Sequence, residues 1–253
     1  MPLSKKQKYL QIALNSTLSE ARSIILKLPS DQRIILEAGT PLIKQYGTRA
    51  ISSLKEFWNY KNFGPQQTSP DIFTLIKDIK NKNLMNKKMV TPSIGGPYIV
   101  ADLKCMDRGF REVELAKSAG ASAATVLGHA PIETIDAFIE KCEELGLDSM
   151  IDMMNVEYPT AILRKLKKVP QVVVLHRGVD EEERNREKAV PYHEIQRLKG
   201  EFDIMIAVAG GDTIREVQTA IFNDVDITVL WKKFYSSTDT TVELVNEFLR
   251  EIR

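Results

Sequence analysis

The sequence contains few cysteines and no long apolar run. Only Cys105 and Cys142 are present among 253 residues, and they form no spaced disulfide framework, so we expect reduced thiols and a cytoplasmic location. No stretch approaches the roughly 18 apolar residues that a membrane span requires. The basic N-terminus, Met1 to Lys8, leads into no long apolar segment. Secretion and membrane insertion are therefore not expected.

An excess of charge of either sign is also absent. Lys and Arg number 35 against 34 for Asp and Glu, so no net field attracts the chain to nucleic acid or to an anionic membrane. A phosphate ligand is still compatible with this charge balance, because binding a phosphate needs only a local positive charge. With 43% hydrophobic and 27% charged residues, the composition is that of an ordinary globular protein, and the length fits two modest domains or one α/β barrel.

Short apolar runs recur along the chain and are separated by segments of helical period. Runs rich in Val, Ile, Leu and Ala without polar alternation are typical of parallel strands that are buried on both faces. The eight runs are Tyr9–Leu14, Arg33–Leu36, Tyr98–Leu103, Ala121–Leu127, Ser149–Asp152, Val172–Leu175, Ile204–Val208 and Ile227–Leu230.

Eight segments of helical period accompany these runs, with Thr17, Pro131 and Asp212 at or just before helix starts. They are Leu18–Leu28, Leu42–Trp58, Phe110–Ala119, Ile132–Leu145, Tyr158–Lys167, Tyr192–Leu198, Thr213–Ile221 and Thr241–Ile252. Because parallel strands need right-handed crossover connections, eight strand-helix units predict a (β/α)8 barrel. An open doubly wound sheet is the alternative.

One segment interrupts the alternation of strands and helices. Residues 59–97 are rich in Asn, Gln, Ser, Lys and Pro, with a single amphipathic stretch at Asp71–Lys80. A connection of this length is uncommon within a compact domain. We therefore predict one barrel domain over residues 1–253 with an insertion at about 59–97 before the third strand, either a solvated excursion or a functional element.

The strongest candidate cluster follows the apolar run Tyr98–Ala101. Strand side chains alternate, so Asp102 and Lys104 are predicted to point together into the barrel mouth, with Asp107 just beyond in the loop. A carboxylate and an ammonium held side by side keep each other charged. The cluster is either catalytic or a structural ion pair at a strand end.

A second carboxylate, Glu37, ends the run Ile34–Leu36 and precedes a turn at Ala38–Pro41. Taken alone, Glu37 is equally compatible with a surface or capping position. Together with Asp102, it offers two carboxylates from different strands, a set that suits Mg²⁺ because this ion leaves its other positions to water and substrate. The sequence therefore predicts a Mg²⁺ site formed by Glu37 and Asp102.

Two further candidates lie at strand ends. His176 follows Val172–Leu175 and is the best acid or base candidate near neutral pH, whereas His129 and His193 are less suitable. Gly210 and Gly211 close the seventh run, where barrels commonly hold phosphate on backbone N–H groups. A packed histidine and a tight turn without ligand are the alternatives.

Six segments of the sequence together resemble 3-hexulose-6-phosphate synthases of the orotidine 5′-monophosphate decarboxylase superfamily. Asp102, Lys104 and Asp107 match the D-x-K-x-x-D signature of that superfamily. The segments occur in family order and are Gln11–Asn15, Glu37–Ile43, Ala101–Asp107, Thr125–Gly128, His176–Asp180 and Ala207–Gly211.

This resemblance implies a homodimeric barrel that adds formaldehyde to D-ribulose 5-phosphate in a Mg²⁺-dependent aldol reaction, or catalyses the reverse cleavage. The product is D-arabino-hex-3-ulose 6-phosphate. The resemblance implies that Glu37 and Asp102 bind the metal and that Lys104 is a polar partner of the enediolate. It also implies that Asp107 reaches the partner subunit's site and that His176 shuttles a proton. Gly210 and Gly211 are implied to bind the phosphate.

The sequence departs from the family pattern in two places. Asn15 stands where relatives usually have Asp, so a catalytic residue at this position lacks the negative charge of a carboxylate. Trp231 and Lys232 stand where the family offers Gly and Arg to the phosphate; an indole excludes the backbone approach that Gly allows, and Lys232 supplies charge without the fork of Arg. Two alternatives therefore stay open, a sugar-acid phosphate decarboxylase and a catalytically impaired paralogue that binds a phosphorylated metabolite.

Overall fold

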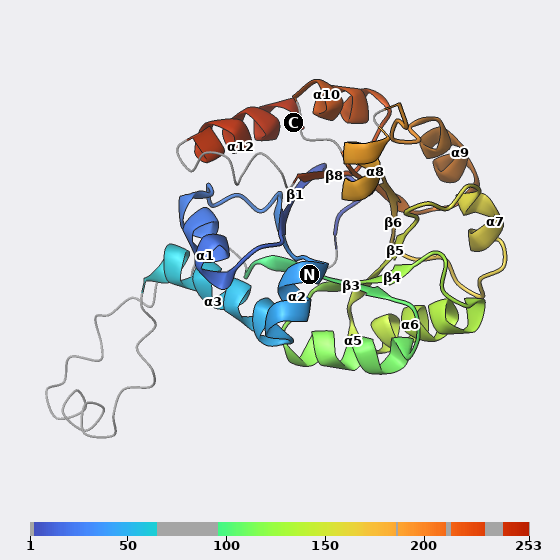
Figure 1. Cartoon of the computed structure of the whole chain (residues 1–253), viewed down its shortest axis with the longest axis horizontal. Helices are drawn as coiled ribbons and strands as arrows, with labels where there is room; N and C mark the ends of the chain where they lie inside the picture. The colour runs from blue at the N-terminus through green and yellow to red at the C-terminus, as the bar shows by residue number, and fades with distance from the viewer. Residues whose placement is uncertain (1–2, 65–95, 186, 211–213, 231–239, 253) are drawn as a thin grey trace, which may run out of the picture.

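The computed structural model describes residues 3–64, 96–185, 187–210, 214–230 and 240–252. Its centre is a closed barrel of parallel strands in the order β1 to β8 (Figure 1). The strands are β1 Tyr9–Leu14, β2 Ile34–Ala38, β3 Tyr98–Cys105, β4 Ala123–Leu127, β5 Asp148–Asp152, β6 Val172–His176, β7 Met205–Ala209 and β8 Ile227–Leu230. The predicted (β/α)8 barrel is confirmed. An open sheet is excluded because β1 pairs with β8, with Leu10 opposite Thr228.

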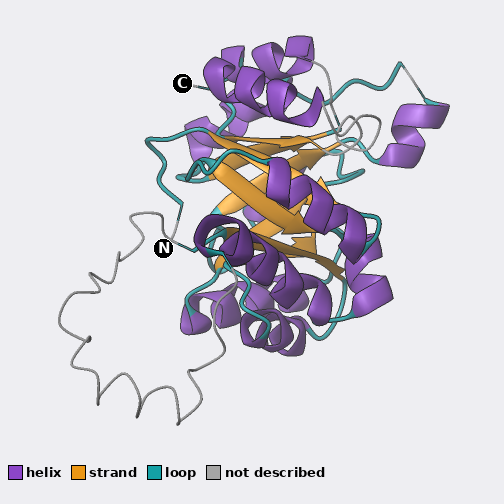
Figure 2. Cartoon of the chain, turned by 90° about the vertical axis from the view of Figure 1, so that its left-hand side faces the viewer, coloured by secondary structure: helices purple, strands orange, loops and turns teal. Residues whose placement is uncertain are grey.

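Helices surround the strands on the outside, as Figures 1 and 2 show. They are α1 Leu18–Lys27, α2 Thr40–Tyr46, α3 Arg49–Phe63, α5 Gly109–Ser118, α6 Ile132–Leu145, α7 Pro159–Leu163, α8 Val179–Arg184, α9 His193–Glu201, α10 Ile214–Phe222 and α12 Thr240–Glu251. Thr17 caps α1 as predicted, since its hydroxyl accepts the Glu20 N–H at 3.2 Å. Across the described part of the chain, none of the helices has the length and apolar character needed to cross a membrane.

The single helix predicted over Leu42–Trp58 is wrong, because two helices occupy this region. Gly47 has a φ of 59°, a left-handed conformation that glycine adopts without strain, and its N–H closes α2 on the Ile43 carbonyl. The chain restarts as α3, which runs on to Phe63. The insertion predicted from residue 59 therefore starts after this helix, and residues 65–95, including the Asp71–Lys80 stretch, lie outside the described residues.

Alternation along the strands divides the buried side chains into two sets. Residues such as Ile12, Leu36 and Ile99 point outward and pack between the strands and the helices. Residues such as Ile35, Val100 and Met150 point inward and fill the barrel. Both faces are apolar, which explains why the strands appear in the sequence as continuous apolar runs. Charged inward side chains lie near the two ends of the barrel, as Asp148 and Asp152 at the two ends of β5 show.

Candidate functional site

The largest concentration of inward polar side chains lies at the carboxyl ends of the strands. A cavity of about 580 Å³ opens there, on the face where barrels of this fold carry their active sites. Its polar lining comes from six strands or the turns that follow them and comprises Gln11, Asn15, Ser16, Glu37, Thr40, Asp102, Lys104, Thr125, Asp152 and His176.

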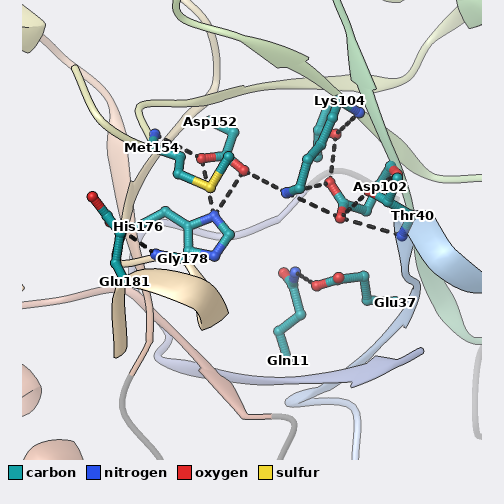
Figure 3. A network of polar contacts seen from close by, with 11 residues as sticks. Gln11, Glu37, Thr40, Asp102, Lys104, Asp152, Met154, His176, Gly178 and Glu181 are labelled. Carbon is teal, nitrogen blue, oxygen red and sulfur yellow. Dashed lines mark hydrogen bonds and ion pairs between the residues drawn. The ribbon is translucent and has the colours of Figure 1, made fainter. Parts of the chain in front are cut away.

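Lys104 lines this cavity, and its ammonium lies between two carboxylates (Figure 3). Its Nζ is 3.1 Å from Asp102 Oδ2 and 2.7 Å from Asp152 Oδ2. Burial lowers the pKa of Lys104, but the charges of Asp102 and Asp152 outweigh it and raise the pKa well above its ordinary value. The predicted pairing of Asp102 with Lys104 is thus present, and Lys104 carries a fixed positive charge.

His176 is held on the other side of Asp152. Its Nδ1 lies 2.9 Å from Asp152 Oδ2, and both residues end their strands, β6 and β5. Burial opposes the charged imidazolium, but Asp152 more than compensates, so the pKa of His176 is raised. Burial likewise favours the neutral form of Asp152, but the charges of His176 and Lys104 outweigh the effect of burial and lower the pKa of Asp152. The histidine therefore belongs to a charged network rather than to the apolar core.

Glu37 lies apart from this network, at the end of β2. Its carboxylate accepts a hydrogen bond from the Gln11 amide, and Figure 3 shows this pair separate from the Asp102, Asp152 and His176 contacts. Burial, and next the negative charge of Asp102, raise the pKa of Glu37 to about 7. Among the described residues, the buried Gln11 Oε1 atom has no hydrogen-bond partner. The charges of Lys104 and His176 lower the pKa of Glu37 less than burial and Asp102 raise it, whereas for Asp152 the same two charges outweigh burial.

The Asp102 carboxylate is oriented by two threonine hydroxyls. Thr40, the first residue of α2, donates to Oδ2 at 2.7 Å, and Thr125 in β4 donates to Oδ1 at 2.9 Å. Only 7% of Asp102 is exposed. Since neutral donors from both neighbouring elements hold the carboxylate, its position does not depend on the Lys104 pair alone.

The remaining predicted residues are placed differently. Asn15 lines the cavity, and a Cβ on Gly39 would lie 1.7 Å from its Oδ1, so the glycine leaves room for this side chain. Gly210 also lines the cavity, with a φ of 104° and no room for a Cβ, which would lie 2.4 Å from the Arg177 carbonyl oxygen. Asp107 is exposed and is not part of the lining. The predictions for Gly211 and Lys232, and the neighbouring Trp231, lie outside the described residues.

Of the two other histidines, neither lines this cavity. His129 is exposed and contacts the Asn155 carbonyl oxygen at 3.0 Å, and the His193 side chain is 78% exposed. Of the three histidines of the chain, His176 is thus the one that lies in this cavity.

Five polar cavity residues were not among the predicted site residues, namely Gln11, Ser16, Thr40, Thr125 and Asp152. Asp152 ends an apolar run, so the rule that selected Glu37 and His176 would have found it. Gln11 and Thr125 are uncharged residues within apolar strands, and only the closed barrel shows that they point inward. No sequence signal identified Thr40, because its contact with Asp102 joins residues 62 positions apart.

The donor atoms present fit a hard divalent cation. Within the described ranges, no group of three or more His, Cys, Asp or Glu is arranged to hold a metal ion. Glu37 and Asp102 form a smaller oxygen set, which matches an ion that keeps several positions for water and substrate. Burial, and next the charge of Asp102, raise the pKa of Glu37, so a cation bound beside these carboxylates would stabilise the charged form of Glu37.

Comparison with known proteins agrees with this geometry. The chain is 34% identical over 235 residues to the bifunctional enzyme Fae/Hps of Methanocella arvoryzae, covering 91% of this chain and 50% of that protein. It is 30% identical over 247 residues to the Fae/Hps enzyme of Methanothrix thermoacetophila, covering 97% of this chain and 53% of that protein. The chain thus spans about half the length of these relatives.

A solved structure and a family model extend the comparison. The 3-hexulose-6-phosphate synthase of Salmonella typhimurium superposes with a TM-score of 0.75 at 25% identity, covering 96% of this chain and 98% of that one. The model described as orotidine 5′-phosphate decarboxylase / HUMPS family matches residues 94–238, more than half of the chain. The chain therefore belongs to the orotidine 5′-phosphate decarboxylase / HUMPS family.

Proposed function

We propose that this chain catalyses the Mg²⁺-dependent aldol addition of formaldehyde to D-ribulose 5-phosphate, giving D-arabino-hex-3-ulose 6-phosphate, or the reverse cleavage. The observation that carries the proposal is the meeting of Glu37, Asp102, Lys104 and His176 in one cavity at the barrel mouth. Relatives named Hps and a solved 3-hexulose-6-phosphate synthase of the same fold support the substrate class.

Glu37 and Asp102 would hold the Mg²⁺. When bound, the ion supplies Lewis acidity that stabilises negative charge developing on the substrate's oxygens. Lys104 adds a fixed ammonium, which its two carboxylate partners keep protonated. A positive charge placed in advance beside an oxygen that becomes negative lowers the barrier without reorganisation.

His176 is suited to move the proton. The reaction removes a proton from C1 of the pentulose phosphate, forms a bond from C1 to the formaldehyde carbon and protonates the former aldehyde oxygen, so atoms and charge balance without another reactant. Because Nδ1 is engaged with Asp152, Nε2 remains for this transfer. Asp152 strengthens the imidazole as a base by stabilising its charged form.

The substrate phosphate would bind near Gly210, at the end of β7. This residue lines the cavity and has no side chain, so it contributes backbone atoms to the lining. Phosphate binding away from C1 provides binding energy that can position the reacting carbons. Gly211 and Lys232 remain predicted contributors to the same subsite.

We also infer a homodimer in which Asp107 faces the partner's site. Asp107 is exposed and lies next to Met106, which is 46% exposed, and close to Phe110, which is 49% exposed. Exposed large apolar side chains beside the cavity are what a subunit interface would cover. Light scattering on the purified chain tests this, and a monomer would contradict it.

The deciding experiment for the reaction is an assay of the purified chain with ribulose 5-phosphate, formaldehyde and Mg²⁺. We expect formaldehyde consumption that chelation of the metal stops and renewed Mg²⁺ restores. A parallel assay for CO₂ release from a sugar-acid phosphate tests the decarboxylase alternative, and CO₂ release without formaldehyde consumption would overturn the proposal. Tight binding of ribulose 5-phosphate without turnover would instead identify an impaired paralogue.

A further inference from the structure

The pairing of β3 with β4 is irregular at the centre of the site. Ala101 pairs with Ala124, and the next pair is Cys105 with Val126. Between these pairs β3 advances by four residues and β4 by two, so the three residues 102–104 lie opposite Thr125 alone. The bulge thus consists of the segment that contains Asp102 and Lys104.

The backbone of this bulge is strained at Lys104. Its φ of 45° is in the left-handed region, which non-glycine residues rarely adopt and which persists only where surrounding contacts hold it. The bulge also takes the Lys104 N–H out of the regular ladder of β3 and β4. A buried N–H without an acceptor would be costly, so this group needs a replacement partner.

The Thr125 side chain supplies that partner. Its Oγ1 accepts the Lys104 N–H at 3.1 Å and donates its own proton to Asp102 Oδ1 at 2.9 Å. One hydroxyl provides both bonds without conflict, because it has one proton to donate and free lone pairs to accept. Thr125 is 4% exposed, so water does not readily replace it.

We propose that Thr125 is a positioning residue, whose hydroxyl fixes the bulge of β3 so that the Asp102 carboxylate and the Lys104 ammonium face the substrate together. This inference rests on the proposed function for its consequence in catalysis. Thr40 holds the other oxygen of Asp102 but is not hydrogen-bonded to Lys104. Thr125 alone, among the described residues, hydrogen-bonds both the backbone of Lys104 and the carboxylate of Asp102 through its side chain.

The test compares Thr125→Ser with Thr125→Ala, which differ from each other only by the oxygen atom. Thr125→Val adds a variant that keeps the shape of threonine. Thr228→Val is the matched control, since Thr228 is a buried strand residue of β8 that does not line the cavity. Two quantities are measured on the full chain: hydrogen exchange at the Lys104 amide by NMR, and kcat with KM for formaldehyde fixation.

In Thr125→Ser, we expect the exchange rate of the Lys104 amide and kcat to stay within about threefold of the wild type. Thr125→Ala should lower kcat by roughly 10- to 100-fold, the effect of losing one hydrogen bond to a charged group. The Lys104 amide should exchange roughly tenfold faster or more in the Ala and Val variants. The Thr228→Val control should change neither quantity.

Equal amide protection in the Ser and Ala variants would overturn the proposal, as would equal kcat in the two. If Thr125→Val does not fold, the Ser and Ala pair still decides. If the wild type fixes no formaldehyde, the proposed reaction fails by itself, and the exchange rate of the Lys104 amide still tests the bridge.

Discussion

The two ends of the barrel both carry inward polar side chains, but the chemistry of the two sets differs. At the amino-terminal end of the strands, the Tyr98 hydroxyl donates to Asp148 Oδ2 at 2.6 Å. The segment preceding β1 covers this floor, with the Leu3 N–H donating to the same oxygen and the Ser4 N–H to the Tyr9 hydroxyl. The floor is thus closed by the chain's own backbone.

The mouth, by contrast, concentrates charge around an open cavity. Lys104 and His176 compensate Asp102 and Asp152, whereas the pKa of Glu37 is raised to about 7 by burial and by Asp102. Pairing with backbone N–H groups stabilises the floor, whereas a charge set that is only partly compensated, as at the mouth, is typical of a site that binds and reacts. Substitutions at the two ends should therefore separate activity from stability.

The largest expected effect is that of Asp102→Asn at the mouth. The amide keeps the shape of the carboxylate but loses its charge, and with it the attraction for Lys104 and the proposed Mg²⁺. We expect kcat/KM for formaldehyde fixation to fall by about 10³-fold or more, corresponding to several kcal/mol. The variant should still fold, although the weaker contacts with Thr40, Thr125 and Lys104 should lower its melting temperature; a folded variant with near wild-type turnover would disprove the assignment of Asp102.

His176→Asn should have the next largest effect. It removes the titrating ring but keeps a polar side chain at the end of β6, so turnover should drop by about 10²-fold, the scale of general acid-base catalysis. Steady-state kinetics should show the loss mainly in kcat, with KM little changed. His193→Asn, at an exposed position away from the cavity, is the control, and equal losses in the two variants would refute the role of His176.

The fold was predictable because the apolar runs report burial on both strand faces. All eight runs correspond to strands, since continuous Val, Ile and Leu segments are stable only between an outer helix layer and a filled barrel. Helix boundaries were less predictable. The break between α2 and α3 depends on the left-handed Gly47, and the short α8 consists of charged residues after Val179 without a helical apolar period.

The site was predictable mainly where a polar residue or a glycine marks a strand end. Glu37, Asp102, Lys104 and His176 lie in the cavity, and so do the uncharged Asn15 and Gly210. The hydrogen bonds that orient them were not predictable, because the partners of Asp102 come from Thr40 and Thr125, and closure of the barrel brings these elements together. Linear spacing also gives no sign of the bulge at residues 102–104.

At the floor, Asp148→Asn should lower stability and spare activity. The amide oxygen of Asn is neutral, so it accepts the Tyr98 hydroxyl and the Leu3 N–H more weakly than the carboxylate oxygen does, and we expect a cost of about 1–2 kcal/mol. Chemical denaturation measures this change. Formaldehyde fixation should stay within about twofold of the wild type; a large loss of turnover in a folded Asp148→Asn variant would erase the proposed separation of the two ends.

The smallest expected effect is a difference in titration between the two ends. Asp152 raises the folded-state pKa of His176 above 6.5, so the stabilisation from this pair is complete below 6.5 and is lost as the pH rises through the folded value. The floor should not respond in this interval, because removal from water and Asp148 raise the pKa of Tyr98 well above 10.0.

NMR titration of the three histidines measures the pKa of His176 directly. Asp152→Asn should lower the titration midpoint of His176, while Asp148→Asn should leave that midpoint unchanged. One proton contributes at most about 1.4 kcal/mol per pH unit, and a His176 midpoint below 6.5 in the wild type would show that burial, not Asp152, controls this histidine.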